Sequence, residues 1–214
     1  MMVKAFLCCA LVLGMSVAAS AAERIQLPEP QKTDGAALLD CLASRHATRE
    51  FADVELTEQQ LSDLLWAAGG VNRADGRFVY PTAMNVQDML IYVVSRAGAF
   101  RYDPQGNALV QVASGDSRAT AGMQPFVASA AVNLVYVQDT ARWKTLKFEA
   151  PAEKVYGFGC VHAGEIAQNV GLYAASQGWA NVVRGSYPEA ELAKLLGLSE
   201  SERILLTQSV GPEA

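Results

Sequence analysis

The sequence predicts a fold in which a mixed β-sheet is covered by helices. Three observations lead to this prediction. Short apolar runs typical of buried strands alternate along the chain with amphipathic helical segments. One pair of runs is separated by a short turn and reads as a hairpin, whereas other runs are separated by helices. Hairpin and helical connections in one chain are typical of a mixed sheet with helices packed against it.

The first residues are predicted to be a secretory signal peptide that ends at Ala21. Lys4 provides a short basic start, an apolar run extends over residues 5–17, and small residues close the segment at 19–21. The apolar run is too short to predict a membrane span. We therefore expect cleavage after Ala21 and export, to a bacterial periplasm or to the medium.

Composition and charge limit the partners of the mature chain. The whole chain has 17 basic and 22 acidic residues and a formal net charge of −5, so that loss of Lys4 with the leader gives −6. This acidic balance argues against nucleic acid as a partner. Cys41 and Cys160 are the cysteines that remain in the mature chain. Two cysteines are not a disulfide framework, although an oxidising compartment would permit one bond between them.

Residues 22–36 are expected to form an exposed, extended lead-in, and residues 37–214 the folded domain. The segment GAALLDCLASR carries a helical apolar stripe. The next helix, LTEQQLSDLLWAAGG, is better defined because Thr57 can cap its start and Gln60 can complete a capping box. The glycine pair at 69–70 is expected to end it.

The middle of the chain is expected to supply strands. Residues 89–95 (MLIYVVS) and 131–139 (AVNLVYVQD) are apolar runs of the length of buried strands. Between them, AFRYDPQGNALVQVA is expected to form a hairpin that turns at residues 103–106.

A long helix is expected from about Val155 to Gln177, with Gly178 beyond its end. The strand ANVVRGS then leads into the helical segment YPEAELAKLLG, in which Pro188 suits a first helical turn. Residues 203–211 are expected to form the last strand.

The segment SRHATREF, residues 44–51, gathers Arg45, His46 and Arg49 where a helical pattern ends. A solvated helix end is one interpretation, because cations are stabilised by the carbonyl end of a helix. An anion site is the other, because guanidinium groups match the oxygen atoms of a phosphate. The segment by itself leaves both open.

Two further segments carry candidate binding groups. Pro81 and Thr82 stand at the head of an expected short helix and Asn85 follows, so backbone donors and an amide could address a heteroaromatic edge. An ordinary helix cap is the alternative. Gly185, at the end of a strand, would let a ligand approach the backbone, with an ordinary turn as the alternative.

Other kinds of site have little support. His162 has no partner at ligand spacing, which argues against a metal site. Neither histidine accompanies a serine or cysteine in a recognisable nucleophile motif, and no GxGxxG sequence or phosphate loop is present. No catalytic side chain is therefore named.

Taken in order, three stretches resemble the FMN-dependent nitroreductase family. They are SRHATREFADVELTEQQLSDLLWAAGGVNRADGRFVYPTAMN, GEIAQNVGLYAASQGWANVVRGS and LLTQSVG, and the resemblance covers nearly everything from Ala37 to Gly211. It implies a nitroreductase-like α+β fold, with a mainly antiparallel sheet and helices on both faces. It also implies an obligate homodimer with two FMN sites at the subunit interface.

The resemblance implies FMN contacts by position. Residues 45–49 match the turn that holds the phosphate and ribityl chain, and Ala47 stands where family members usually have serine. Residues 81–83 match a Pro-Ser-Ala turn beside the flavin, the backbone of 183–185 matches the segment that faces the reactive ring edge, and 210–211 match the strand next to the phosphate. The implied cofactor-binding residues are Arg45, His46, Ala47, Arg49, Pro81, Thr82, Ala83, Asn85, Val183, Arg184, Gly185, Val210 and Gly211.

The implied function is that of an oxidoreductase that moves a hydride through FMN to a small electron-poor acceptor of the nitroaromatic or quinone kind. Donor groups around Arg184 and Gly185 would stabilise charge on the reduced ring. The electron donor would be NAD(P)H or, outside the cytoplasm, another reductant. Two alternatives remain: an exported dimeric flavin- or ligand-binding protein without turnover, and a flavin-dependent dehydrogenase of a modified peptide.

Residues 140–159 have no assigned role. Their aromatic residues, Trp143, Phe148, Tyr156 and Phe158, are expected to be core or dimer contacts more than substrate groups. If any segment sets substrate preference it is this one, because variable loops carry specificity on a fixed scaffold.

Overall fold

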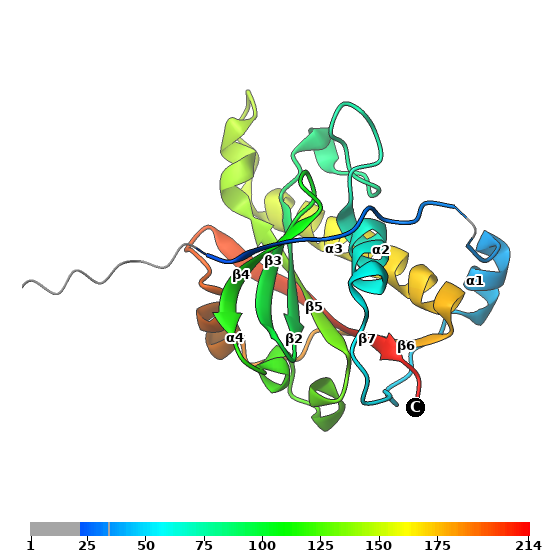
Figure 1. Ribbon diagram of the computed structural model, residues 1–214. Coiled ribbons are helices and arrows are strands. Elements are labelled where there is room, and N and C mark those ends of the chain that lie inside the picture. The colour runs from blue at the N-terminus through cyan, green and yellow to red at the C-terminus, as the bar shows by residue number, and fades with distance from the viewer. Residues whose placement is uncertain (1–21, 34) are drawn as a thin grey trace, which may run out of the picture.

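A computed structural model describes residues 22–33 and 35–214, and their strands form one seven-stranded sheet in the order β1-β4-β3-β2-β5-β7-β6 (Figure 1). The expected signal peptide, residues 1–21, lies outside the described residues. All pairings between neighbouring strands of this sheet are antiparallel. The predicted α+β class is therefore confirmed, with an antiparallel sheet in place of the mixed one.

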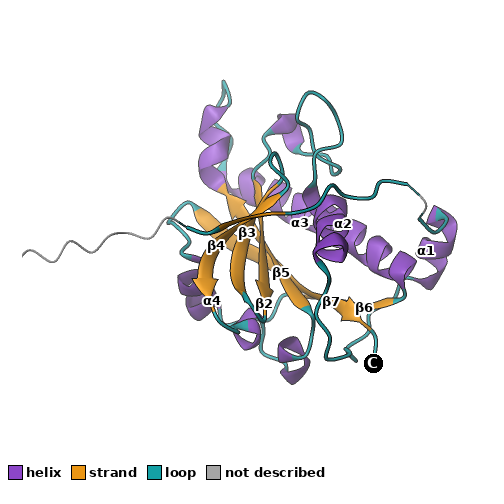
Figure 2. Cartoon of the chain, in the orientation of Figure 1, coloured by secondary structure: helices purple, strands orange, loops and turns teal. Residues whose placement is uncertain are grey.

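The elements follow one another as Figure 2 shows. The strands are β1 (Arg24–Gln26), β2 (Met89–Ser95), β3 (Gly98–Asp103), β4 (Ala108–Ser114), β5 (Val132–Asp139), β6 (Trp179–Arg184) and β7 (Glu202–Pro212). The α-helices are α1 (Leu38–Ser44), α2 (Glu58–Gly69), α3 (Ala152–Gln177) and α4 (Glu189–Leu196). Short 3-10 helices are η1 (Ala83–Asn85), η2 (Arg118–Ala121), η3 (Pro125–Ala128) and η4 (Thr140–Thr145).

Local signals located the ends of the two main helices. Gln60 N donates to Thr57 Oγ1 over 3.2 Å and Thr57 N donates to Gln60 Oε1 over 2.9 Å, which is the expected capping box of α2. The long helix α3 starts at Ala152, three residues before the expected Val155. It ends before Gly178, whose φ of 64° lies in the left-handed region that favours glycine.

The lead-in is extended, as expected, but it is not exposed throughout. Its strand β1 pairs with β4, with Ile25 opposite Leu109. Leu27 is only 4% exposed and belongs to the main core. A three-residue strand is too short to show a period in the sequence, so only its pairing with β4 reveals it.

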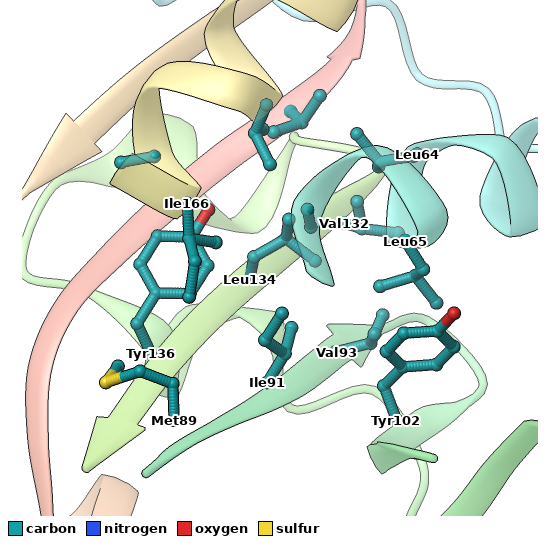
Figure 3. Close-up of a cluster of buried hydrophobic side chains, with 14 of the residues drawn as sticks. Leu64, Leu65, Met89, Ile91, Val93, Tyr102, Val132, Leu134, Tyr136 and Ile166 are labelled. Carbon is teal, nitrogen blue, oxygen red and sulfur yellow. The ribbon is translucent and has the colours of Figure 1, made fainter. Parts of the chain in front are cut away.

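Helices α2 and α3 cover one face of the sheet (Figure 1). Figure 3 shows Leu64 and Leu65 of α2 and Ile166 of α3 directed at the sheet, where Leu134 and Tyr136 of β5 lie. All five side chains are fully buried. This core packs α3 against the sheet and so fixes its position. The candidate site residues lie beside this helix.

Helix α4 and the short helix η2 cover the opposite face. Leu192 and Leu196 of α4 pack there with Val135 and Val137 of β5. Because successive side chains of a strand point to opposite faces, β5 buries apolar residues on both sides. This explains why residues 131–139 read as a continuous apolar run instead of an alternating one.

Two further findings concern the described residues. Cys41 is buried and Cys160 is exposed, and both are free cysteines, so the permitted disulfide is not formed. Among the helices of residues 22–33 and 35–214, none is both long and apolar enough to cross a bilayer.

Candidate functional site

The cationic turn, residues 45–49, is attached to the edge strand β6 (Figure 1). Thr48 N donates to Asn181 O over 3.0 Å, and Asn181 N donates to Thr48 Oγ1 over 3.2 Å. The Asn181 side chain donates through Nδ2 to His46 O over 3.3 Å. His46 Nδ1 lies 2.7 Å from Ser44 O, so the side chains of His46 and Thr48 are bound within the protein, whereas those of Arg45 and Arg49 remain available.

Arg45 and Arg49 present unneutralised charge from this turn. Both residues are exposed, and within the described part of the chain neither forms an ion pair or a side-chain hydrogen bond. The Arg45 stem lies against α3, where a Cβ added at Gly171 would stand 3.5 Å from Arg45 Cδ. Ala47 is exposed between the two arginines. Two free guanidinium groups on an anchored turn could bind an anion, and the anion site stays a prediction beside the solvated helix end.

The strand β6 keeps a free edge beyond the cationic turn. Asn181 directs its backbone N–H and C=O away from β7 and towards Thr48. Because residues two apart on a strand share an edge, the backbone groups of Val183 point the same way. The Val183 side chain is 42% exposed, and a Cβ added at Gly185 would meet nothing within 4 Å. The backbone at Val183 and Gly185 is therefore open to a ligand, whereas Arg184 pairs with Thr207 of β7.

The side chain of Arg184 is not open to a ligand, so the role that the resemblance implies for this segment is left to its backbone. Arg184 is 6% exposed, and its guanidinium donates to Ala121 O over 2.8 Å, to Asn133 Oδ1 over 3.0 Å and to Ser209 Oγ over 3.1 Å. Burial lowers the pKa of Arg184 to about 10. The donors expected around this residue therefore exclude the guanidinium, because the pleat of β6 turns it towards η2 on the far face.

Val210 and Gly211 lie in β7, which pairs with the edge strand β6. Val210 is fully buried and faces Asn181 of β6, whereas Gly211 faces Ala180. A Cβ added at Gly211 would stand 2.9 Å from Ala131 Cβ. No side chain is therefore available to a ligand at these two positions, and the expectation that this strand lies next to a phosphate stays a prediction that concerns its backbone.

The turn of residues 81–85 lies elsewhere and borders a cavity of about 440 Å³. Pro81, Thr82 and Asn85 line this cavity together with Arg73 and Arg77. The backbone here is unusual, because the non-glycine residues at 84, 85 and 87 have φ values of 52°, 55° and 49°. Such left-handed conformations are uncommon for residues with a Cβ and persist where surrounding contacts hold them.

One of the backbone donors expected at this turn is already bound. Ala83 N donates to His162 Nε2 over 2.9 Å, so this N–H is bound within the protein, and binding of a ligand by the other groups of the turn stays a prediction. His162 is 2% exposed, and its Nδ1 lies 2.8 Å from Asp88 Oδ1. No three histidine, cysteine, aspartate or glutamate side chains cluster as metal ligands would within the described residues.

Helix α3 separates this turn from the cationic turn. Ala83 is held at His162, whereas Arg45 lies against Gly171. Nine residues on an α-helix correspond to about 13.5 Å along the axis and half a turn around it. The two turns therefore lie on opposite flanks of α3 within one chain.

Sequence reasoning missed Asp88, which is fully buried before β2. Gln138 Nε2 and Trp143 Nε1 each donate to Asp88 Oδ2 over 2.7 Å. Burial acts to raise the pKa of Asp88, but the hydrogen bonds from His162, Gln138 and Trp143 outweigh it and the pKa is lowered overall. Its partners come from distant segments, so no local spacing could have indicated this cluster.

The aromatic residues of 140–159 divide into two groups. Trp143 is 5% exposed and belongs to a small core cluster, which confirms a core role for it. Phe148, Tyr156 and Phe158 are 51%, 49% and 40% exposed, so their role in a dimer stays a prediction. A cavity of about 940 Å³ lies between this segment and Arg203 of β7.

Comparisons with known proteins find similarity over most of the chain. The sequence model of the nitroreductase family matches residues 42–212. A curated relative from Methanocaldococcus jannaschii, named as a nitroreductase, is 30% identical over 197 residues, which are 85% of this chain and 93% of the relative.

Solved structures agree with this match. A protein of Ralstonia eutropha JMP134, named as a nitroreductase, superposes with a TM-score of 0.82 at 38% identity, over 89% of this chain and 90% of that one. The NADPH:FMN oxidoreductase of Vibrio harveyi superposes with a TM-score of 0.62 at 24% identity, over 82% and 68% of the two chains. The superposition on the Vibrio harveyi protein shows a shared fold only.

Proposed function

Since the chain belongs to the nitroreductase family, we propose that this oxidoreductase depends on FMN and moves a hydride to a small electron-poor acceptor of the nitroaromatic or quinone kind. The observation that carries the proposal is the pair Arg45 and Arg49. Their guanidinium groups lie on a turn anchored to β6, with no ion-pair partner within the described residues. Such a pair matches a phosphate monoester, which is the charged end of FMN.

The donor set beside this turn also fits a flavin. The backbone of Val183 lies on the free edge of β6, and Gly185 leaves open space where a side chain would stand. Backbone N–H and C=O groups can bind the polar edge of a planar ring. A bound flavin would accept a hydride from a reductant and deliver it to the acceptor. The chain's own part is to bind and orient the cofactor, and no side chain is proposed as a catalytic acid or base.

We further propose a homodimer with two FMN sites at the subunit interface. The turns at 45–49 and 81–85 lie on opposite flanks of α3, so a site that uses both needs a second copy to supply one of them. The exposed side of α3 between these flanks contains Gly157, Val161 and Gly164, and additional Cβ atoms at both glycines would meet nothing. This narrow apolar surface would allow close helix packing.

Helix α1 supports the same proposal. Leu38, Leu39 and Leu42 are 63%, 76% and 47% exposed. Exposed apolar side chains clustered on one short helix are typical of a surface that another chain covers. A second copy that packs on α3 would extend over α1, since these two helices contact each other.

Export is also a proposal, based on residues 1–21. Outside the cytoplasm the electron donor would be a reductant other than NAD(P)H, whereas retention would allow NAD(P)H itself. Intact mass of the protein from its native host decides the first point. A mature chain that begins at Ala22 supports export, and one that still carries Met1 contradicts it.

The decisive experiment is to purify the chain and record its absorbance spectrum. A flavin band that bleaches with reductant and returns with a quinone or nitroaromatic acceptor supports the proposed enzyme. A flavin band that bleaches without turnover of any such acceptor supports the alternative of a binding protein or of a dehydrogenase of a modified peptide. Failure to bind added FMN contradicts the cofactor assignment.

A further inference from the structure

His162 connects a buried carboxylate to the turn of residues 81–85. Its Nδ1 lies 2.8 Å from Asp88 Oδ1, and its Nε2 accepts the N–H of Ala83 over 2.9 Å. The imidazole is 2% exposed and Asp88 is fully buried. We propose that His162 is a positioning residue that holds this turn in its binding conformation, with Asp88 selecting the tautomer that makes this possible.

The chemistry of the two partners dictates the tautomer. A backbone N–H can only donate, so Nε2 must be the unprotonated nitrogen that accepts from Ala83. An ionised carboxylate can only accept, so Nδ1 must carry the proton that Asp88 receives. The neutral imidazole with its proton on Nδ1 satisfies both contacts, and the other tautomer satisfies neither.

The backbone of the turn is strained and needs a bond that attaches it to the rest of the fold. We call the hydrogen bond from Ala83 N to His162 Nε2 the anchor. Met84, Asn85 and Gln87 have φ values of 52°, 55° and 49°, a region that costs energy for residues with a Cβ. Gln87 N donates to Thr82 Oγ1 over 3.3 Å, which closes the turn on itself but does not attach its start to the fold. The bond from Ala83 to His162 provides an attachment to α3.

The carboxylate of Asp88, which fixes His162, is itself held by side chains from two other elements. Asp88 accepts from Gln138 of β5 and from Trp143 of η4, each over 2.7 Å. Gln138 Nε2 also donates to Val155 O of α3 over 2.8 Å. A Cβ at Gly159 would lie 2.4 Å from Gln138 Cδ, so this glycine is required for the close approach of β5 to the helix.

Phe158 completes the enclosure of the imidazole. Its ring centroid lies 6.2 Å from that of His162 and 5.7 Å from that of Trp143, with the rings stacked in both pairs. The histidine is thus packed on its face and hydrogen-bonded at both nitrogens. It does not need to touch a ligand to influence the turn, which is why its role is one of positioning.

The link from this turn to the cofactor rests on the proposed function, whereas the link from His162 to the turn does not. The test therefore compares two variants in two measurements. In His162→Gln the longer amide can reach the Nε2 position and accept from Ala83. In His162→Asn the shorter amide can reach Asp88 but not Ala83, so it serves as the matched variant with the anchor removed.

The first measurement is hydrogen exchange of the Ala83 amide in the full chain without FMN. We expect exchange about two- to tenfold faster in His162→Asn than in the parent, as loss of one neutral hydrogen bond implies, and near-parental exchange in His162→Gln. The second measurement is FMN affinity, which should fall by a similar factor in His162→Asn and recover in His162→Gln. Parental exchange in both variants overturns the anchor. Faster exchange with parental FMN affinity in His162→Asn overturns the positioning role.

A spectroscopic measurement tests the anchor without any substitution. The nitrogen chemical shifts of His162 in the folded parent should identify a protonated Nδ1 and an unprotonated Nε2. The opposite tautomer would overturn the inference even if neither variant folds. If the parent has this tautomer and a slowly exchanging Ala83 amide but binds no FMN, the proposed function fails while the anchor stands.

Discussion

The stem of Arg45 lies across α3 at Gly171, where an added Cβ would stand 3.5 Å from Arg45 Cδ and 3.6 Å from Cγ. The helix thus supports the aliphatic part of the side chain while the guanidinium remains free. Asn181 of β6 holds the backbone of the same turn. Helix α3 and strand β6, which follow each other in the sequence more than 100 residues after Arg45, therefore jointly position this cation.

Replacing Arg45 or Arg49 by alanine should weaken FMN binding by about tenfold to a hundredfold. Each charge-assisted contact to a phosphate contributes about 1.5–3 kcal/mol. Fluorescence titration with FMN measures the change, and Arg101→Ala is the matched control because Arg101 is an exposed arginine on β3, outside the candidate site. If both variants bind FMN as the parent does, the turn is only a solvated helix end.

Replacing Ala47 by serine should tighten FMN binding by about two- to tenfold. Ala47 is exposed on the cationic turn, and a serine adds a hydroxyl donor worth about 0.5–1.5 kcal/mol net. The control is Ala43→Ser, at an exposed position of α1 before the turn. Unchanged or weaker binding in Ala47→Ser would show that Ala47 faces away from the ligand.

Replacing Gly122 by alanine should destabilise the fold by about 1–3 kcal/mol through overpacking. The new Cβ would stand 1.8 Å from Arg184 Nη1 and 2.8 Å from Val127 Cγ2. Arg184 cannot move away easily, because three hydrogen bonds hold its buried guanidinium. Urea unfolding measures the loss, with Gly35→Ala as a control that adds the same methyl group to open space. Equal stability of Gly122→Ala and the parent would contradict this packing.

Replacing Val161 by glutamate should convert the proposed dimer to monomers and reduce FMN binding. Val161 is 54% exposed on α3, and burying an unpaired carboxylate in an interface is costly. Sedimentation velocity at several concentrations reports the mass, and Val112→Glu on β4 is the control because Val112 is also exposed. A Val161→Glu protein that remains dimeric places the interface elsewhere.

Replacing Asp88 by asparagine should lower stability at neutral pH and much less in acid. The folded pKa of Asp88 lies below its unfolded value, so the carboxylate contributes stability above the unfolded pKa, and this contribution is lost as the pH falls through the folded pKa. The pH range in which this contribution to stability is lost lies below about pH 4, the ordinary pKa of an aspartate. Urea unfolding of Asp88→Asn and the parent at pH 7 and pH 3 gives the comparison. An equal difference at both values would mean that the charge of Asp88 is not what stabilises the cluster.

Much of the fold could be predicted because its signals are local. The capping box of Thr57 and Gln60, the left-handed Gly178 and the apolar run of β2 each lie within a few residues of the element they define. Strand β1 could not be predicted in this way, since three residues carry no period. Its place depends on its pairing with β4, which is more than eighty residues away along the chain.

The candidate site was predictable only in part, for the same reason. Spacing indicated Arg45 and Arg49 as a pair, but the sequence could not show that Arg184 points to the far face of the sheet or that Val210 is enclosed between strands. The direction of a side chain on a strand depends on register, and register depends on the whole sheet.

The sequence by itself determined the four α-helices, the strands other than β1, the α+β class and the charges of the cationic turn, because periodicity, caps and charge spacing act between neighbouring residues. Only the tertiary structure decided that α3 stands between the cationic turn and the turn at 81–85. It alone also brought Asp88 and His162 together from segments 74 residues apart. The physical reason is that burial of the sheet core, which no local pattern encodes, sets where α3 lies and which polar groups must pair beneath it.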